Sequence, residues 1–515
     1  MKGRLARASV LWTVALLLSR GIGVVRESVL GATLGVSSSA DVYAAAFRVP
    51  DMFAYIVSGG ALSIIFIPMF TAHAQRGDEA RAWRAFSVVA NFIVILLAIC
   101  TPLAWLAMPW LAPHLAPGFS PTDLALLVKL SRIVLPAQVF HLLGGLLSAS
   151  LLARDKHTAP ALAPLVYTLG IIAGGLIFRS PEGFAWGVLG GAFAGPFLLP
   201  LLAALRSGLR WQPVFSFRDP DFRSYLGQAL PVMLGFSIVS VDDVAWTYFA
   251  SDLGAGNVAL LNYAKTLMKV PMGVFGMAMG YAAYPTLARL CAEGKPGEAY
   301  QTLMVAGRRA LLLAFASQVA LTVAGPEIAT IVLGTRRIPV ERMAELGVAV
   351  GVFSLALGAW TAQTLVARGF YARGKAWLPT WLGFAVLVVT LPLYGVLGRA
   401  FGLNGLALAS SIGIVIYTVL LSVQLRREIG EGPGFGNFLL RALPATALAI
   451  GVGLLVRAWM PPLDGTRLQA AWRLGALALV GGPAWLAATW ALRVPEIDNV
   501  LGFLRRRLPG ARRGA

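Results

Sequence analysis

Apolar segments of 18 or more residues follow one another along almost the whole chain, with short polar loops between them. Each is long enough to cross a hydrocarbon layer of about 30 Å as a helix. Of the 515 residues, 58% are hydrophobic and 13% are charged, which leaves too little polar surface for a water-soluble globule of this size. A membrane barrel would instead show alternating segments of about ten residues. The sequence therefore predicts an all-α polytopic membrane protein.

Hydropathy and turn signals predict about fourteen transmembrane helices. They centre on residues 9–34, 40–71, 86–110, 123–152, 159–178, 184–205, 226–250, 257–288, 306–333, 343–371, 377–398, 403–424, 437–458 and 470–491. Loops after even-numbered spans are rich in arginine and lysine, whereas the loops at 35–40, 113–120 and 253–257 contain neither. Because positive loops stay on the cytoplasmic side, both termini are expected to be cytoplasmic. The net charge of +20 follows from the same rule, so nucleic acid is not expected as a partner.

The second half of the sequence repeats parts of the first at an offset of about 217 residues. The segment Ala153-Arg154-Asp155-Lys156 returns as Ala372-Arg373-Gly374-Lys375, and Pro68 returns as Pro285. This offset covers six predicted spans, an even number, so the two copies have the same orientation in the membrane. The pattern predicts two six-helix lobes related as parallel repeats.

The lobes and the remaining segments divide the chain into four parts. We expect an N-terminal lobe of spans one to six over 1–210 and a C-terminal lobe of spans seven to twelve over 211–428. Two further C-terminal helices occupy 429–492, and a basic cytoplasmic tail occupies 493–515. Two lobes around a site at the midplane of the membrane are typical of transporters.

Ionisable residues lie inside several predicted spans, where a charge costs several kcal/mol and therefore indicates function. They are Arg20, Arg26 and Glu27 in the first span, Asp41, Arg48 and Asp51 in the second, Asp242 and Asp243 in the seventh, and Lys265 and Lys269 in the eighth. At a rise of 1.5 Å per residue, Arg20, Arg48 and Lys265 reach similar depths near the midplane. Such cations predict a cavity between the lobes that binds an anionic ligand, because guanidinium groups pair with phosphate or carboxylate oxygens.

Two alternatives stay open for these charges. The cations can instead form structural pairs with the intramembrane acids, most simply Arg26 with its neighbour Glu27. Asp242 and Asp243 can either exchange a proton or a sodium ion during transport or pair with Lys265 and Lys269. Coupling to Na⁺, to H⁺ or to the membrane potential is therefore left undecided.

Signals of catalysis and of cofactor binding are not found in the sequence. The chain has no Gly-rich phosphate loop and no nucleophile elbow, and its two cysteines, Cys100 and Cys291, do not form a metal motif. We expect a transporter without a metal or cofactor rather than an enzyme.

The residues in these spans resemble a known family. The first two spans carry Ser19-Arg20, Gly23, Arg26, Gly35, Asp41, Ala46-Phe47, Pro50, Gly60-Ala61, Phe66 and Pro68. Further similarity lies in Ala116-Pro117-Gly118-Phe119, Pro160, Pro164, Phe249-Ala250-Ser251, Tyr263-Ala264, Leu267-Met268, Pro271, Gly273 and Gly369-Phe370-Tyr371. As a set these residues are similar to the MurJ/MviN family, the lipid II flippases of the multidrug/oligosaccharidyl-lipid/polysaccharide exporter superfamily.

The resemblance implies a function and a site. It implies alternating access that moves an undecaprenyl-diphosphate-linked peptidoglycan precursor, lipid II, across the bacterial cytoplasmic (inner) membrane for cell-wall biosynthesis. The two last helices are implied to form a groove for the lipid tail. By position, Arg20 and Arg26 match the essential first-span arginines of the family, and Asp41 matches its second-span acid. The expected substrate-binding residues are thus Arg20, Arg26, Asp41, Arg48, Lys265 and Lys269.

The second and eighth spans depart from the family pattern. In the second, Ala54 and Gly59 stand where members commonly carry an arginine and an acid. In the eighth, Lys265-Thr266 stands where they carry Asp-Arg, and Lys269 stands where they carry an acid. Lys265 and Lys269 supply positive charge nearby without the bidentate fork of arginine. The alternative substrate is therefore another polyprenyl-diphosphate-linked oligosaccharide.

An alternative function of a different class is that of a membrane-embedded glycosyl transferase or polymerase that uses the same donor lipids. A third possible function is that of a non-transporting scaffold for envelope assembly. Membrane lipids and other cell-wall synthesis proteins are the expected partners.

Overall fold

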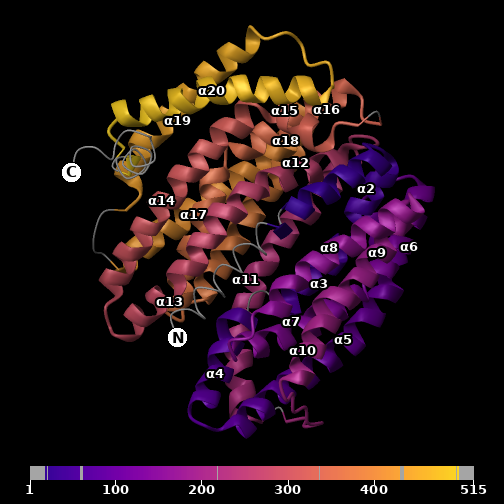
Figure 1. The fold of residues 1–515 in the computed structure, drawn as a ribbon, viewed down its shortest axis with the longest axis vertical. Coiled ribbons are helices and arrows are strands. Elements are labelled where there is room, and N and C mark those ends of the chain that lie inside the picture. The colour runs from indigo at the N-terminus through magenta and orange to yellow at the C-terminus, as the bar shows by residue number, and fades with distance from the viewer. Residues whose placement is uncertain are drawn as a thin grey trace, which may run out of the picture. The chain divides into compact units, whose positions relative to one another are not determined.

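The computed structural model describes residues 18–19, 21–57, 62–216, 218–335, 337–429, 434–494 and 496–497. Within these ranges every regular element is a helix, which confirms the all-α prediction (Figure 1). Among the described residues, eight helices are long and apolar enough to cross a membrane, or nine if the bent pair Val340–Ser354 and Leu357–Ala372 is one span. The protein is therefore a multi-pass membrane protein, and the count of about fourteen spans stays a prediction.

The described chain forms two compact units. The first comprises the described residues of Met1–Asn262 and Thr335–Ile338, and the second those of Tyr263–Gly334 and Pro339–Ala515. The division falls inside the predicted eighth span rather than at 210, because the seventh span packs against helices of the first six. Packing does not test a sequence repeat, so the lobes at 1–210 and 211–428, the pair at 429–492 and the tail at 493–515 stay predictions.

The first unit begins with a helix over residues 21–34. It continues with α2 (Ser38–Ala45), α3 (Arg48–Val57), the π-helix η1 (Leu62–Phe66), α4 (Ile67–Gln75), α5 (Glu79–Leu115), α6 (Pro121–Val134), α7 (Ala137–Leu152), α8 (Thr158–Phe178), α9 (Pro181–Ala192), the π-helix η2 (Phe193–Leu198), α10 (Leu199–Arg206) and α11 (Pro220–Ser251). The side chains of Ser37, Ser120 and Ser180 accept a backbone N–H at the starts of α2, α6 and α9. Such caps satisfy amides that have no partner within the helix.

In the described part of the predicted second span, 40–71, α2 ends at Ala45, α3 begins at Arg48, and η1 continues directly into α4. Pro50 lies in the first turn of α3 and Pro68 in the first turn of α4. Proline has no amide N–H to continue the preceding helix but suits the first turn of a new one, so both residues favour a new segment. Beyond this break, Phe70 on α4 and Trp83 on α5 pack edge to face with ring centroids 5.2 Å apart, which fixes α4 against α5.

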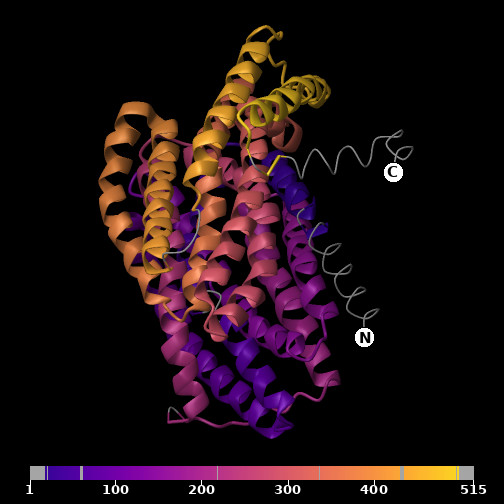
Figure 2. The same ribbon diagram turned by 90° about the vertical axis from the view of Figure 1, so that its left-hand side faces the viewer.

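The second unit starts within α12 (Asn257–Pro271) and contains the π-helix η3 (Met272–Met277), α13 (Ala278–Ala292), α14 (Pro296–Val323), α15 (Gly325–Leu333), α16 (Val340–Ser354), α17 (Leu357–Ala372), α18 (Trp377–Ile429), α19 (Gly436–Ala458) and α20 (Arg467–Ala491). The long α18 is broken at Gly402, whose φ of 56° is favoured only for glycine. Its two halves run back along each other, and the Tyr417 hydroxyl donates to the Pro379 carbonyl at 3.0 Å (Figure 2). The break falls between the spans predicted at 377–398 and 403–424.

Candidate functional site

Asp41 lies on α2 and is 2% exposed. Its Oδ2 accepts a hydrogen bond from the Gly256 amide at 2.5 Å, and its Oδ1 accepts one from the Ala259 amide at 2.6 Å. Gly256 directly precedes α12, and Ala259 is the third residue of α12. The amides of a helix N-terminus have no partner within the helix, and the positive end of the helix dipole favours a carboxylate. In this structure the predicted substrate-binding acid therefore caps a helix of another span.

Arg48, at the start of α3, is 5% exposed. Its Nε donates to the Thr247 hydroxyl at 2.8 Å, and its Nη2 donates to Asn262 Oδ1 at 3.1 Å. The guanidinium carbon also lies 4.5 Å from the centroid of the Trp246 ring. Hydrogen bonds and an aromatic face together compensate for part of the cost of burying a cation. Arg48 thus ties the second span to the seventh and to the start of the eighth.

Asp243 belongs to the same network. The Trp246 indole Nε1 donates to Asp243 Oδ1 at 3.1 Å, and the Thr247 hydroxyl donates to the Asp243 carbonyl at 2.7 Å. The two residues that contact Arg48 on α11 are therefore both bonded to Asp243. The structure brings together Arg48 and Asp243, while Asp242 lies half-buried beside them on α11.

Arg26 is half-buried in the helix over residues 21–34 and pairs with Glu27, which is 5% exposed. The Arg26 Nε donates to Glu27 Oε1 at 3.1 Å, and its Nη2 makes a second bond to the same oxygen. This neighbouring pair is the structural alternative that the sequence left open for Arg26. Arg20 lies outside the described residues.

The predicted lysines belong to the second unit. Lys265 on α12 is 2% exposed, and its Nζ lies 5.4 Å from the centroid of the Trp360 ring on α17. Lys269, one turn further along α12, is half-buried. An aromatic face attracts an ammonium group at this distance, so Trp360 is one of the groups that stabilise Lys265 in its buried position.

Arg368 is an intramembrane cation that the sequence analysis did not single out. It lies on α17, within the span predicted at 343–371, and is half-buried. A Cβ atom added to Gly280 on α13 would lie 1.4 Å from its Nη1, so a larger residue there would displace the end of the Arg368 side chain. Its position in an apolar span was the signal that could have found it.

A buried ion cluster in the second unit was missed as well. Glu327 on α15 is completely buried, and its Oε1 accepts a hydrogen bond from the Arg473 Nε on α20 at 2.9 Å. The Arg457 Nε on α19 lies 3.8 Å from the same oxygen. The cluster therefore joins the two C-terminal helices to α15.

Beside this cluster, an apolar cavity of about 140 Å³ lies between α14 and α20. Its lining includes Val319 and Val323 on α14 and Leu477, Gly481 and Trp485 on α20. Such a lining suits hydrocarbon rather than a polar group.

The described residues contain no cluster of three or more histidine, cysteine, aspartate or glutamate side chains that could hold a metal ion. Both Cys100 and Cys291 are free thiols.

Comparison with known proteins shows which family this sequence is similar to. A family model described as "Lipid II flippase MurJ" matches residues 30–466. "Lipid II flippase MurJ" of Burkholderia cenocepacia is 26% identical over 497 residues, which cover 91% of this chain and 95% of that protein. "Probable lipid II flippase MurJ" of Rhizobium tropici is 26% identical over 96% of each chain.

Solved structures show the same fold. The structure titled "Lipid II flippase MurJ, inward closed conformation" is similar with a TM-score of 0.75 and 18% identity, over 95% of this chain and 100% of that one. An inward-facing multidrug resistance MATE transporter of the MOP superfamily is similar with a TM-score of 0.67 and 15% identity, over 81% of this chain and 98% of that one. With the family model matched over most of its length, the chain belongs to the lipid II flippase MurJ family.

Proposed function

We propose that this chain flips lipid II across the bacterial cytoplasmic membrane by alternating access, in the synthesis of the cell wall. The observation that carries the proposal is the family match over residues 30–466, which includes the described intramembrane charges Asp41, Arg48, Asp243, Lys265 and Lys269. A diphosphate is a strong anion, and cations inside an otherwise apolar protein suit it. The proposed orientation places both termini in the cytoplasm.

The diphosphate-binding cations of the proposal are Arg20, Arg26, Lys265 and Lys269. Arg26 can reach a phosphate by exchanging its Glu27 partner for the ligand. Lys265 is supported by its burial against Trp360, since a desolvated ammonium group interacts strongly with an incoming anion. Arg368 joins this set, because it lies on α17 within a predicted span, as Lys265 and Lys269 lie on α12.

Asp41 and Arg48 have a different proposed role. Both bond to α11 or to the α11–α12 turn, so we assign them to holding the second span against the seventh and eighth. In the proposed transport cycle these bonds break when the protein changes conformation. An arriving diphosphate can compete for Arg48, which would couple substrate binding to release of this contact.

The coupling ion and the lipid tail complete the proposal. Asp243 is the preferred coupling acid of the pair Asp242 and Asp243, because protonation or ion binding at its carboxylate would alter the bond from Trp246 and thereby the Arg48 network. Na⁺, H⁺ and the membrane potential all remain candidates for the driving force. The cavity between α14 and α20 is the proposed place for part of the undecaprenyl chain, which is supported by its apolar lining.

Replacement of a cell's own lipid II flippase tests the function. We expect this gene to restore growth and peptidoglycan synthesis when the resident flippase is depleted. Failure at normal membrane expression would contradict lipid II as the substrate. Restoration of a surface polysaccharide in an exporter-deficient strain would then favour the alternative, another polyprenyl-diphosphate-linked saccharide, for which Thr266 in place of an arginine is the supporting observation.

A further inference from the structure

The segment over residues 207–219, called here the linker, joins α10 to α11 and is fixed along its length to the first unit. At its start, Arg154 Nη1 donates to the Ser207 carbonyl at 2.6 Å, and Lys156 Nζ bonds to the Ser207 hydroxyl at 2.8 Å. In its middle, the Asn91 amide on α5 donates to the carbonyls of Gln212 and Val214 at 3.0 and 2.9 Å. The linker therefore has a defined face toward the protein and a defined face away from it.

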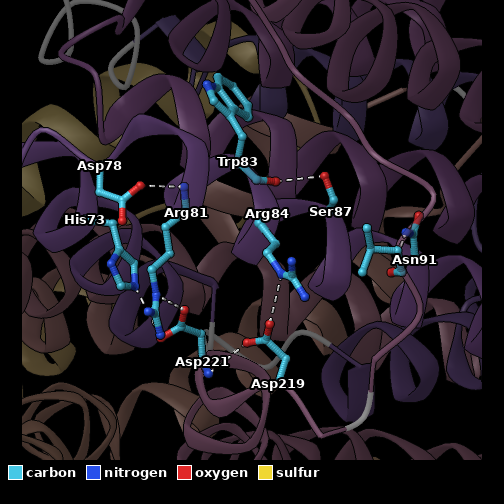
Figure 3. A network of polar contacts seen from close by, with 10 residues as sticks. His73, Asp78, Arg81, Trp83, Arg84, Ser87, Asn91, Asp219 and Asp221 are labelled. Carbon is cyan, nitrogen blue, oxygen red and sulfur yellow. Dashed lines mark hydrogen bonds and ion pairs between the residues drawn. The ribbon is translucent and has the colours of Figure 1, made fainter.

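The acidic residues at the end of the linker and the start of α11 face the protein. Asp219 pairs with Arg84 at 3.4 Å, and Asp221 pairs with Arg81 at 3.0 Å. The His73 imidazole Nε2 lies 3.2 Å from the second oxygen of Asp221. Figure 3 shows the two carboxylates pointing to these partners on α4 and α5. Their negative charge is thus opposed by cations of the protein itself.

The exposed side chains of the linker are basic and aromatic rather than acidic. Arg210 and Arg218 are exposed, as is Arg206 at the end of α10. Between them lie the aromatic rings of Trp211, 56% exposed, and Phe215, 61% exposed. Only the indole N–H of Trp211 turns inward, where it donates to Asn91 Oδ1 at 2.8 Å. Three arginines and two aromatic rings are therefore exposed in and beside this segment, whereas the neighbouring acids are paired with the protein.

The position along α5 at which the linker is bonded places its exposed side chains near the edge of the hydrocarbon layer. α5 has 37 residues, about 55 Å at 1.5 Å per residue, so it is longer than a hydrocarbon core of about 30 Å. Its last charged residue is Arg84, and the linker is bonded to Ser87 and Asn91, within two turns of it. Exposed tryptophan at such a boundary is typical of the membrane interface.

We propose that the outward face of the linker docks onto anionic phospholipid headgroups of the adjacent leaflet, with Arg206, Arg210 and Arg218 pairing with lipid phosphates and with Trp211 and Phe215 inserted at the interface. A basic segment near an anionic leaflet gains about 1 kcal/mol per arginine, and aromatic side chains add apolar contact. The surface is separate from the proposed substrate site and does not depend on which lipid-linked sugar is carried.

A fluorescence experiment on the full chain tests the docking. Cys100 and Cys291 are replaced by alanine, Pro213→Cys on the exposed part of the linker is labelled with an environment-sensitive fluorophore, and the protein is reconstituted in phosphatidylcholine vesicles with or without phosphatidylglycerol. We expect a headgroup-level lipid quencher to act more strongly when phosphatidylglycerol is present. High salt should reduce the effect, because exposed charges are screened.

Variants that remove single arginine charges test whether these arginines cause the docking. Each of Arg206→Gln, Arg210→Gln and Arg218→Gln is expected to lower the docked population about fivefold relative to the undocked one, the factor that corresponds to about 1 kcal/mol. Arg179→Gln, at the C-terminal end of α8, is the matched control and should leave quenching unchanged. Quenching that ignores phosphatidylglycerol and all three arginines, or a label reached only by an aqueous quencher in both vesicles, would overturn the proposal. Flipping activity of each variant is measured in parallel and is independent of this outcome.

Discussion

At the scale of single residues, buried charges in this chain tie together spans that are far apart in sequence. Asp41 caps a helix at residues separated from it by 215 and 218 positions, and Arg48 bonds to residues 199 and 214 positions away. Each contact satisfies a group that would otherwise be costly inside the membrane. The hydrogen bonds of Asp41 and Arg48 therefore stabilise the conformation described here, and a conformation without these bonds would be less stable by their contribution.

Replacing Asp41 tests the cap. Asp41→Ala should lower the melting temperature in detergent, because it removes two charge-assisted bonds to α12, and a lost cap costs about 1–2 kcal/mol. Asp78→Ala removes a cap from α5 at an exposed site and is the matched control, with a smaller expected change. Equal melting temperatures for Asp41→Ala and the parent would contradict the capping role.

Arg48→Lys tests whether charge alone suffices. Lysine keeps the positive charge but cannot bond to Thr247 and Asn262 with one planar fork while lying on Trp246. We expect a loss of about 2 kcal/mol in stability and a loss of flipping. Arg132→Lys is the control, since Arg132 lies 4.1 Å from the Trp105 ring centroid and its bond to the Trp105 carbonyl is exposed. Wild-type flipping by Arg48→Lys would refute the need for arginine geometry.

The sequence located several of these residues but not their partners. The cost of a charge in an apolar span singled out Asp41 and Arg48, and the same rule applied to every span would have added Glu327 and Arg368. That Asp41 caps α12 could not be predicted, because the sequence signals of a helix start are local, whereas this capping acid comes from a distant span. The pairing of Arg26 was foreseeable, since Glu27 is its neighbour in sequence.

At the scale of elements, the two C-terminal helices are attached through one buried ion cluster. Arg473 bonds to Glu327 with its Nε and to the Pro461 carbonyl with its Nη1, and Arg457 donates to the Val323 carbonyl at 3.2 Å. Removing one partner of a buried ion pair leaves an uncompensated charge, at a cost of about 3–5 kcal/mol. The placement of α19 and α20 on α14 and α15 therefore depends on Glu327.

Glu327→Gln should lower the melting temperature strongly for this reason. Arg457→Ala should have a weaker effect, because Arg457 is the more distant and more exposed partner. The control is Glu298→Gln, which removes an exposed pair with Lys295 and should change little. A melting temperature for Glu327→Gln as high as that of Glu298→Gln would contradict the account of the cluster.

The ion pairs at the start of α11 are expected to stabilise this end of the helix. Asp221→Asn weakens the contacts to both Arg81 and His73, so the first turns of α11 should open more often. Exposed pairs contribute on the order of 1 kcal/mol or less each, so deuterium uptake over residues 220–230 should rise a few-fold. Glu345→Gln, which removes the exposed pair with Arg342, serves as the control for residues 220–230. Unchanged uptake in Asp221→Asn would show that other contacts hold this helix end.

Corresponding loops of the two predicted repeats carry the same kind of contact. Arg154 and Lys156 both bond to Ser207 at the end of α10, and Arg373 and Lys375 both bond to Glu428 at the end of α18. Asp155 and Gly374, between the basic residues of each pair, both have a left-handed φ. The two loops therefore match in these contacts, while the duplication itself stays a prediction from the sequence.

At the scale of the whole molecule, composition and span spacing were enough to predict an all-α membrane protein. Helix breaks were harder to predict. Hydropathy alone predicts one span over 40–71, because the apolar side chains continue through the turn that separates α2 from α3. Hydropathy also does not report packing, so it could not show that α11 groups with the preceding helices.

Transport of lipid II by the purified chain tests the central claim most directly. Proteoliposomes containing fluorescent lipid II are treated with dithionite, which reduces only the fluorophore in the outer leaflet. The account predicts that the parent chain makes the inner-leaflet pool accessible, that Arg20→Ala abolishes this, and that Arg179→Ala retains it. A parent protein that leaves the inner-leaflet pool protected, as protein-free vesicles do, would contradict the account.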